Sequence, residues 1–130
     1  MGRGGEQGEV ETLNEAATMV QGEMQKVIRE KGMAGLYRLT LHAEKERLMD
    51  QLTTDHIEQA LSTAEVIEDY PEDKRGHSCL VLGWSSSGPV HLVIGGLEGG
   101  GQAELVVITI YRPDLSQWEA DWRTRKEKTT

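Results

Sequence analysis

Three stretches of sequence decide the fold of this chain: SCLVLGW at Ser78–Trp84, VHLVI at Val90–Ile94 and AELVVITIY at Ala103–Tyr111. All three are rich in Val, Ile and Leu, which is typical of strands. The third is almost continuously apolar, as expected of a strand covered on both faces. A serine turn and the glycine-rich loop Gly95–Gly101 separate the three stretches. The pattern predicts consecutive antiparallel strands.

A shorter strand and two helices are predicted just before this region. Val66–Tyr70 is the short strand, and the proline at position 71 stops it. A first helix is predicted from Leu41 to about Gln51, with Thr40 as N-cap. Its inward residues are expected to be Leu48, Met49 and Leu52. A second helix follows Thr53–Asp55, and its apolar residues at helical spacing are Ile57, Ala60, Leu61 and Ala64.

The two ends of the chain also carry helical patterns. Val10–Lys31 has one apolar stripe at steps of three, four and seven, which predicts a helix. A short strand is predicted after it, at Tyr37–Leu41. Leu115–Trp122 is predicted as a short final helix with its two tryptophans in step. Helices segregate from strands, so we expect an α+β fold with helices packed on one antiparallel sheet of about four strands and an extra N-terminal helix.

The expected domain organisation is simple. Residues 1–8 form a disordered tail, 9–36 the N-terminal helix, 37–122 one folded domain and 123–130 a basic tail. The 130-residue chain has a single cysteine, Cys79, so no internal disulfide can form, which fits a reducing compartment. No stretch approaches the roughly 20 apolar residues of a membrane span, and the N-terminus does not read as a secretory signal. We therefore expect a cytoplasmic protein.

The net charge of −8 is unevenly placed. Tyr37–Trp122 holds 6 basic and 15 acidic residues, whereas the tail from Arg123 holds 4 basic and 1 acidic. An acidic domain repels nucleic acid at long range unless its few cations are clustered. The acidic run contains Glu65, Glu68, Asp69, Glu72 and Asp73. It is a candidate site for a divalent cation, a docking surface for a basic partner, or a plain solvated surface.

Two histidines are candidates for proton transfer. His42 opens a helix and His91 lies within an apolar strand, and each is either a catalytic acid or base or a hydrogen-bonded packing residue. No histidine pair has the spacing of a zinc site, and His77 with Cys79 supplies too few ligands for one. The sequence therefore predicts no metal and no cofactor.

A few cations are candidates for RNA contact. Lys74, Arg75 and Arg112 are the only basic residues in the strand region, and with Tyr111 they are the minimum needed to meet a phosphate and stack a base. The alternative is that all four belong to an ordinary surface.

Several blocks of this sequence resemble one known family. They are YRLTLHA at 37–43, VIEDYPED at 66–73, SCLVLG at 78–83, VHLV at 90–93 and ITIYRPD at 108–114, together with Trp118. These blocks resemble the DUF4258 family of domains of unknown function over about residues 37–122. That family is similar to the RelE and BrnT toxins, small α+β domains with two helices on an antiparallel sheet.

The resemblance implies a function and a set of residues. It implies an RNA-cleaving toxin that works without metal, in several relatives beside a zinc-finger antitoxin of the YgiT or MqsA type, and commonly acting on the ribosome. His42, His91, Tyr111 and Arg112 match the expected catalytic positions, with Lys74 and Arg75 as RNA-binding residues. The alternative is a non-catalytic protein-interaction module on the same scaffold, in which the N-terminal helix mediates docking or a homodimer.

One departure from the family pattern bears on that choice. The commoner pattern after the His-Ala pair resembles H-A-x-x-R-M-x-x-R, but Glu46 and Asp50 hold the two arginine positions here. Arg47 is shifted by one residue, or about 100° around a helix, so it does not restore the missing charge on that face. The sequence indicates either a lost RNA contact or RNA binding on another face.

Overall fold

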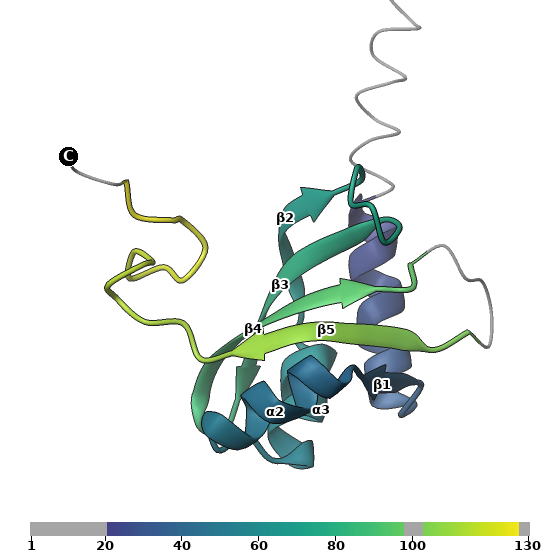
Figure 1. Ribbon diagram of the computed structural model, residues 1–130, viewed down its shortest axis with the longest axis horizontal. Coiled ribbons are helices and arrows are strands. Elements are labelled where there is room, and N and C mark those ends of the chain that lie inside the picture. The colour runs from purple at the N-terminus through teal and green to yellow at the C-terminus, as the bar shows by residue number, and fades with distance from the viewer. Residues whose placement is uncertain (1–20, 98–102, 128–130) are drawn as a thin grey trace, which may run out of the picture.

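The computed structural model describes residues 21–97 and 103–127 (Figure 1). Along the chain lie a helix over residues 21–33, β1 (Tyr37–Leu39), α2 (Leu41–Met49), α3 (Thr54–Ser62), β2 (Glu65–Tyr70), β3 (Ser78–Ser85), β4 (Gly88–Gly95) and β5 (Leu105–Tyr111). This order confirms the α+β fold with an added N-terminal helix. The predicted tail at 1–8 and the predicted start of that helix lie outside the described residues.

The sheet has five strands in the order β1-β5-β4-β3-β2. Strands β2 to β5 form the expected antiparallel run, and β1 adds a parallel neighbour to β5. Because β1 has three residues and pairs only with Leu105–Val107, the second half of β5 has no strand beside it on that edge. Helix α2 lies along this open edge (Figure 1).

Helix α3 packs against β3 with its apolar residues inward, as predicted. It begins in a capping box, in which the Thr53 hydroxyl accepts from the backbone N–H of His56 and the His56 ring accepts from the backbone N–H of Thr53. Its apolar residues Ile57, Ala60 and Leu61 are buried in the core. The helix lies so close to β3 that a Cβ on Gly83 would be 2.1 Å from the carbonyl oxygen of Ala60, so only glycine fits there.

Helix α2 packs with the opposite face from the one predicted. Thr40 is its N-cap, as expected, and accepts from the N–H of Ala43. Ala43 is the buried side chain of this helix, while Leu48 and Met49 point to solvent, so their predicted inward placement is wrong. Leu52, just after the helix, is buried as predicted.

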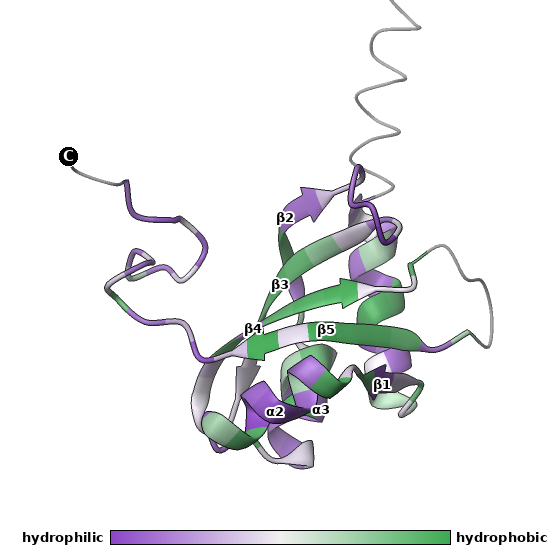
Figure 2. Cartoon of the chain, viewed as in Figure 1, coloured by the Kyte–Doolittle hydropathy of each residue, from purple (hydrophilic) through white to green (hydrophobic). Residues whose placement is uncertain are grey.

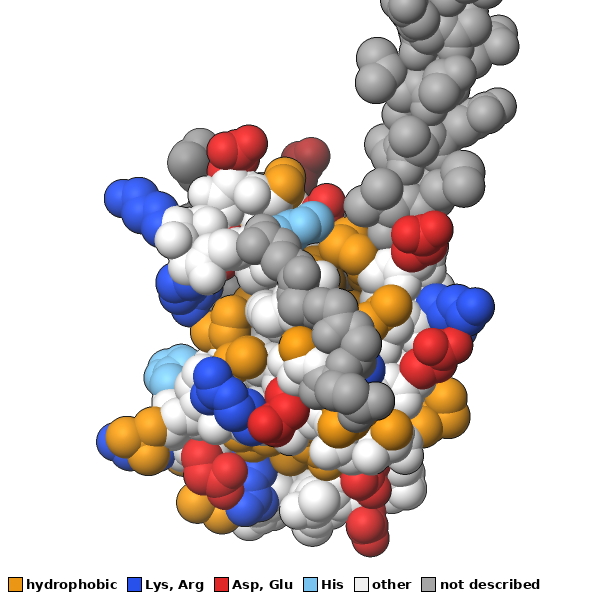
Figure 3. Space-filling model, turned by 90° about the vertical axis from the view of Figure 1, so that its right-hand side faces the viewer, with side chains coloured by type: hydrophobic (Ala, Val, Ile, Leu, Met, Phe, Trp, Pro, Cys, Tyr) orange, Lys and Arg blue, Asp and Glu red, His pale blue; other side chains and the backbone are white. Residues whose placement is uncertain are grey.

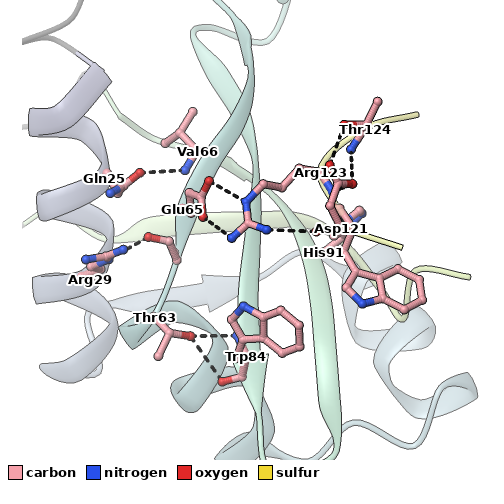
Figure 4. Close-up of polar contacts among 12 residues, drawn as sticks. Gln25, Arg29, Thr63, Glu65, Val66, Trp84, His91, Asp121, Arg123 and Thr124 are labelled. Carbon is pink, nitrogen blue, oxygen red and sulfur yellow. Dashed lines mark hydrogen bonds and ion pairs between the residues drawn. The ribbon is translucent and has the colours of Figure 1, made fainter. Parts of the chain in front are cut away.

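The N-terminal helix lies on the α3 side of the sheet and reaches from β2 to the segment just before β5 (Figure 1). Its Gln25 Oε1 accepts from the backbone N–H of Val66 at 3.0 Å, and the Arg29 Nε donates to the carbonyl oxygen of Ala64 at 2.7 Å (Figure 4). The Met24 and Ile28 side chains of this helix are buried. The described part of its apolar stripe thus faces its own domain, and the proposed homodimer through this helix stays a prediction.

Residues 113–127 form a C-terminal strap rather than the predicted helix. The segment is made of turns, with an isolated bridge between Trp118 and Arg125 and a positive φ of 62° at Trp122. It lies on the side of the sheet away from the helices (Figure 1). The strands are largely apolar and the strap largely polar (Figure 2). Contacts with the sheet, described below, replace the helical hydrogen bonds that the tryptophan spacing suggested.

Candidate functional site

Two of the predicted catalytic residues meet on the strap side of the sheet. His91 on β4 and Tyr111 on β5 are direct partners in the strand register. The His91 Nδ1 lies 3.0 Å from the Tyr111 Oη, and the two rings meet edge to face at 5.2 Å between centroids. The sequence suggested each residue separately, but only the register of two adjacent strands brings them together.

The hydrogen bonds of His91 define its protonation. Its Nε2 lies 2.7 Å from the carbonyl oxygen of Trp122, and a carbonyl can only accept, so Nε2 carries the proton. Nδ1 then accepts from the Tyr111 hydroxyl. Burial lowers the pKa of His91 and raises that of Tyr111, so both side chains are neutral near pH 7. His91 is fully buried, and it reaches no solvent in this state.

The strap is what covers this pair. The Trp118 ring stands edge to face against His91 at 4.4 Å, and it is itself buried. Above it, the Arg125 guanidinium lies 4.7 Å from the Trp118 ring centroid, within the range of a cation–π contact. His91 is therefore enclosed by Tyr111, Trp118 and the backbone of Trp122.

Two arginines fasten the strap to β2. The Arg123 guanidinium donates to both carboxylate oxygens of Glu65 at 2.8 and 2.7 Å (Figure 4). Arg125 donates to both oxygens of Glu68 at 2.8 and 2.9 Å. These bonds lower the pKa of each glutamate. The acidic run was a candidate docking surface for a basic partner. Part of it pairs with the basic tail of its own chain, which the sequence analysis did not foresee.

His42 and Arg112 lie by α2, at the edge of β5. The His42 Nε2 is 3.3 Å from the Glu46 Oε1, and the histidine side chain is 68% exposed. The Arg112 guanidinium donates to the carbonyl oxygen of Asp50 at 2.8 Å and to the Ser87 Oγ at 2.9 Å. Arg112 thus ties the end of α2 to the β3–β4 turn. Within the described residues, neither the His42 nor the Arg112 side chain contacts the side chains of His91 and Tyr111.

The two acids Glu46 and Asp50, which stand where the resemblance led us to expect arginines, have a structural role. The Glu46 Oε1 accepts from the backbone N–H of Ile110 at 3.0 Å, and the Asp50 Oδ2 accepts from that of Arg112 at 2.8 Å. Thr40 completes this edge by donating to the carbonyl oxygen of Ile108 at 3.1 Å. These side chains stand in for the missing neighbour strand, because unpaired backbone groups at a covered edge are costly.

The predicted RNA-binding cations occupy the β2–β3 turn. Arg75 donates to the Asp73 carboxylate at 3.0 Å, which lowers the pKa of Asp73, and Lys74 is exposed nearby. Neither contacts His91, Tyr111 or Arg112 within the described ranges. Basic and acidic side chains alternate over the face that Figure 3 presents. Of the described arginines, all but Arg38 form a hydrogen bond or ion pair with the chain itself.

The outward face of α2 is the most apolar exposed surface of a described helix. Leu41, Leu48 and Met49 are 73%, 61% and 83% exposed. Positions 41, 45, 48 and 49 follow helical spacing, so these side chains form one stripe with Lys45 in its middle. Lys45 makes no ion pair with any described residue.

Two further features bear on chemistry. Over residues 21–97 and 103–127, no group of three His, Cys, Asp or Glu side chains is placed to hold a metal ion. Burial, with the Asp69 charge in second place, raises the pKa of Cys79 to about 12, so this thiol stays protonated.

Among the described helices, none has the length and apolar character needed to cross a membrane.

Comparison with known proteins gives a family and nothing closer. Residues 39–112 match the family described as a domain of unknown function (DUF4258). No curated protein and no solved structure matches the chain.

Proposed function

This chain belongs to the DUF4258 family, and from that premise we propose that it is a non-catalytic protein-binding module. One observation carries the proposal: three of the four catalytic candidates, His91, Tyr111 and Arg112, are already used within the fold. His91 is buried, neutral and bonded through both ring nitrogens, and Arg112 is bonded to Asp50 and Ser87. A general base must reach a proton on its substrate, which an enclosed imidazole does not.

The charges support the same proposal. RNA binding needs Lys and Arg that are free to meet phosphates. Here the arginines of the strap and of the β2–β3 turn are paired with acids of the chain, and the net charge is −8. We place the module in the cytoplasm, where its single thiol, Cys79, remains reduced.

An RNA-cleaving toxin is the second candidate, and the His91–Tyr111 hydrogen bond favours it. Two of the four residues that match the toxin positions are hydrogen-bonded to one another, an arrangement suited to moving a proton. This candidate requires the strap to leave the sheet so that RNA can reach the pair. An antitoxin of the zinc-finger type, or the ribosome, would then be the partner.

Tightly induced expression, combined with incubation of the purified full chain with RNA, separates the two candidates. The module proposal expects normal growth and intact RNA for wild type and for a His91→Gln, Tyr111→Phe double variant. Growth arrest and RNA cuts by wild type that disappear in the double variant would overturn it. The His42→Ala variant is measured beside them, because His42 is an exposed catalytic candidate outside the enclosed pair, and loss of RNA cutting in this variant would also support the toxin candidate.

A further inference from the structure

The two faces of α2 are exchanged relative to an ordinary surface helix. Such a helix turns its apolar stripe to the core and its charges to water. In α2 the acids Glu46 and Asp50 point to the β5 edge, and Leu41, Leu48 and Met49 point to solvent. The inward face is fixed by two backbone hydrogen bonds, so the helix cannot rotate to bury the stripe without leaving the N–H groups of β5 unpaired.

The exposed stripe has the dimensions of a helix-binding surface. Residues 41 to 49 rise about 12 Å along the axis, which is two turns. A second helix packs its own ridge of side chains along such a stripe. Transfer of each leucine or methionine from water into such a contact favours binding.

A second copy of this chain does not fit the stripe. Two-fold dimers place the same patch of both copies face to face. The stripe is centred on Lys45. Lys45 of one copy would therefore face Lys45 of the other, whether the two α2 helices pair antiparallel or parallel. Like charges in contact at an apolar centre are unfavourable, and each copy also carries a net charge of −8.

The charges around the stripe describe a different partner. Lys45 is exposed and has no carboxylate partner in the described chain, so its ammonium group is available to a carboxylate from outside. The stripe lies on a strongly acidic domain, because Tyr37–Trp122 holds 15 acidic and 6 basic residues. A complementary surface is therefore apolar, with one acid at its centre and basic residues beside it.

We propose that the outward face of α2 binds an amphipathic helix of a basic partner protein, with one carboxylate of that helix on Lys45. The proposal rests on the protein-binding function proposed above and names its surface and its partner class. Leu41, Leu48 and Met49 supply the apolar contact, and the net charge of −8 attracts the basic flank of the partner helix.

Two synthetic helical peptides test the proposal with the full chain in fluorescence anisotropy. Both carry a leucine ridge, one with a central glutamate and arginine flanks, the other with a central lysine and glutamate flanks. Wild type is expected to bind the first at least about tenfold more tightly than the second. Leu48→Asp should weaken binding of the first by about tenfold or more, because it places a charge in the apolar contact.

Lys45→Glu should lose that preference for the glutamate peptide. The matched control is Leu115→Asp, which changes a leucine that is 52% exposed in the strap rather than on α2, and it should bind like wild type. Circular dichroism of each variant verifies that the fold is retained.

Two results would overturn the proposal. Equal binding of both peptides by wild type, or unchanged binding by Leu48→Asp, would show that the stripe is not the docking surface. A dimer in sedimentation velocity that Leu48→Asp converts to monomer would assign the stripe to a second copy. Neither result involves RNA, so failure of the docking proposal leaves the non-catalytic function standing. RNA cuts that disappear in the His91→Gln, Tyr111→Phe double variant would instead overturn the non-catalytic function.

Discussion

Helices α2 and α3 follow one another in the chain and have equal length, but they turn opposite kinds of side chain toward the protein. Both have nine residues, and both begin with a threonine cap. Helix α3 buries Ile57, Ala60 and Leu61 against β3 and exposes its charges. Helix α2 directs Glu46 and Asp50 to the protein and its large apolar side chains to water. The difference lies in what each helix covers, because α3 lies over an apolar sheet face and α2 beside an unpaired strand edge.

The comparison teaches that a helix face follows its local partner rather than a general rule of apolar burial. A strand edge offers backbone N–H and C=O groups, and only polar side chains satisfy them. We expect stability to depend on apolar volume in α3 and on hydrogen-bond acceptors in α2. Four sets of variants test this expectation by urea unfolding.

The largest expected effect separates the leucines of the two helices. Leu61→Ala in α3 removes a fully buried side chain and should cost about 2–5 kcal/mol of unfolding free energy. Leu48→Ala in α2 removes a solvent-exposed side chain and should change stability by no more than about 0.5 kcal/mol. Similar losses for both variants would show that α2 packs its apolar face after all.

The next effect concerns the edge acceptors. Glu46→Leu leaves the N–H of Ile110 without an acceptor and should cost about 1–3 kcal/mol. Glu46→Gln keeps an oxygen at that position and should retain most of the stability. If leucine proved harmless here, the acceptor role of α2 would be wrong. Glu58→Leu on the exposed face of α3 is the matched control.

A smaller effect distinguishes the two caps. Thr53→Ala should cost about 1 kcal/mol, the usual value for a lost N-cap. Thr40→Ala should cost more by up to about 1 kcal/mol, because the Thr40 hydroxyl also donates to the carbonyl oxygen of Ile108. Equal losses would indicate that this second hydrogen bond adds nothing. Thr→Ser variants at both positions keep the hydroxyl and serve as controls.

The smallest effect should follow from polar substitutions on the stripe. Leu48→Lys and Met49→Lys are expected to leave the unfolding free energy within about 0.5 kcal/mol of wild type, because both side chains are already in water. A marked loss from the α2 variants would argue that the stripe is covered in the isolated chain.

The sequence was sufficient for α3 and misleading for α2. The apolar residues of α3 recur at helical spacing and are buried as predicted. The same reasoning placed Leu48 and Met49 inward, because periodicity measures amphipathicity without revealing which face meets the protein. The correct answer depends on the three-residue length of β1, which leaves half of the β5 edge uncovered. No local pattern contains that information.

The site was predictable only in part. His91 and Tyr111 were identified singly, whereas their contact depends on the β4–β5 register. The spacing of Trp118 and Trp122 indicated a helix, but contacts of the strap with His91 and with the acids of β2 gave a different conformation. The roles of Glu46 and Asp50 also depend on tertiary neighbours. In the sequence Glu46 and Asp50 stood out only because they replaced expected arginines, whereas in the structure they accept backbone hydrogen bonds.

The side chains at the sheet edges also restrict how this protein can assemble. Many proteins recruit a partner by adding its strand to an open edge, through backbone hydrogen bonds that any sequence can make. Here Glu46 occupies the N–H of Ile110 on β5, Asp50 that of Arg112 just after it, and Gln25 that of Val66 on β2. Strand addition at these positions would have to displace hydrogen bonds already formed. Recognition is thereby directed to side-chain surfaces, which discriminate between partner sequences and do not template aggregation.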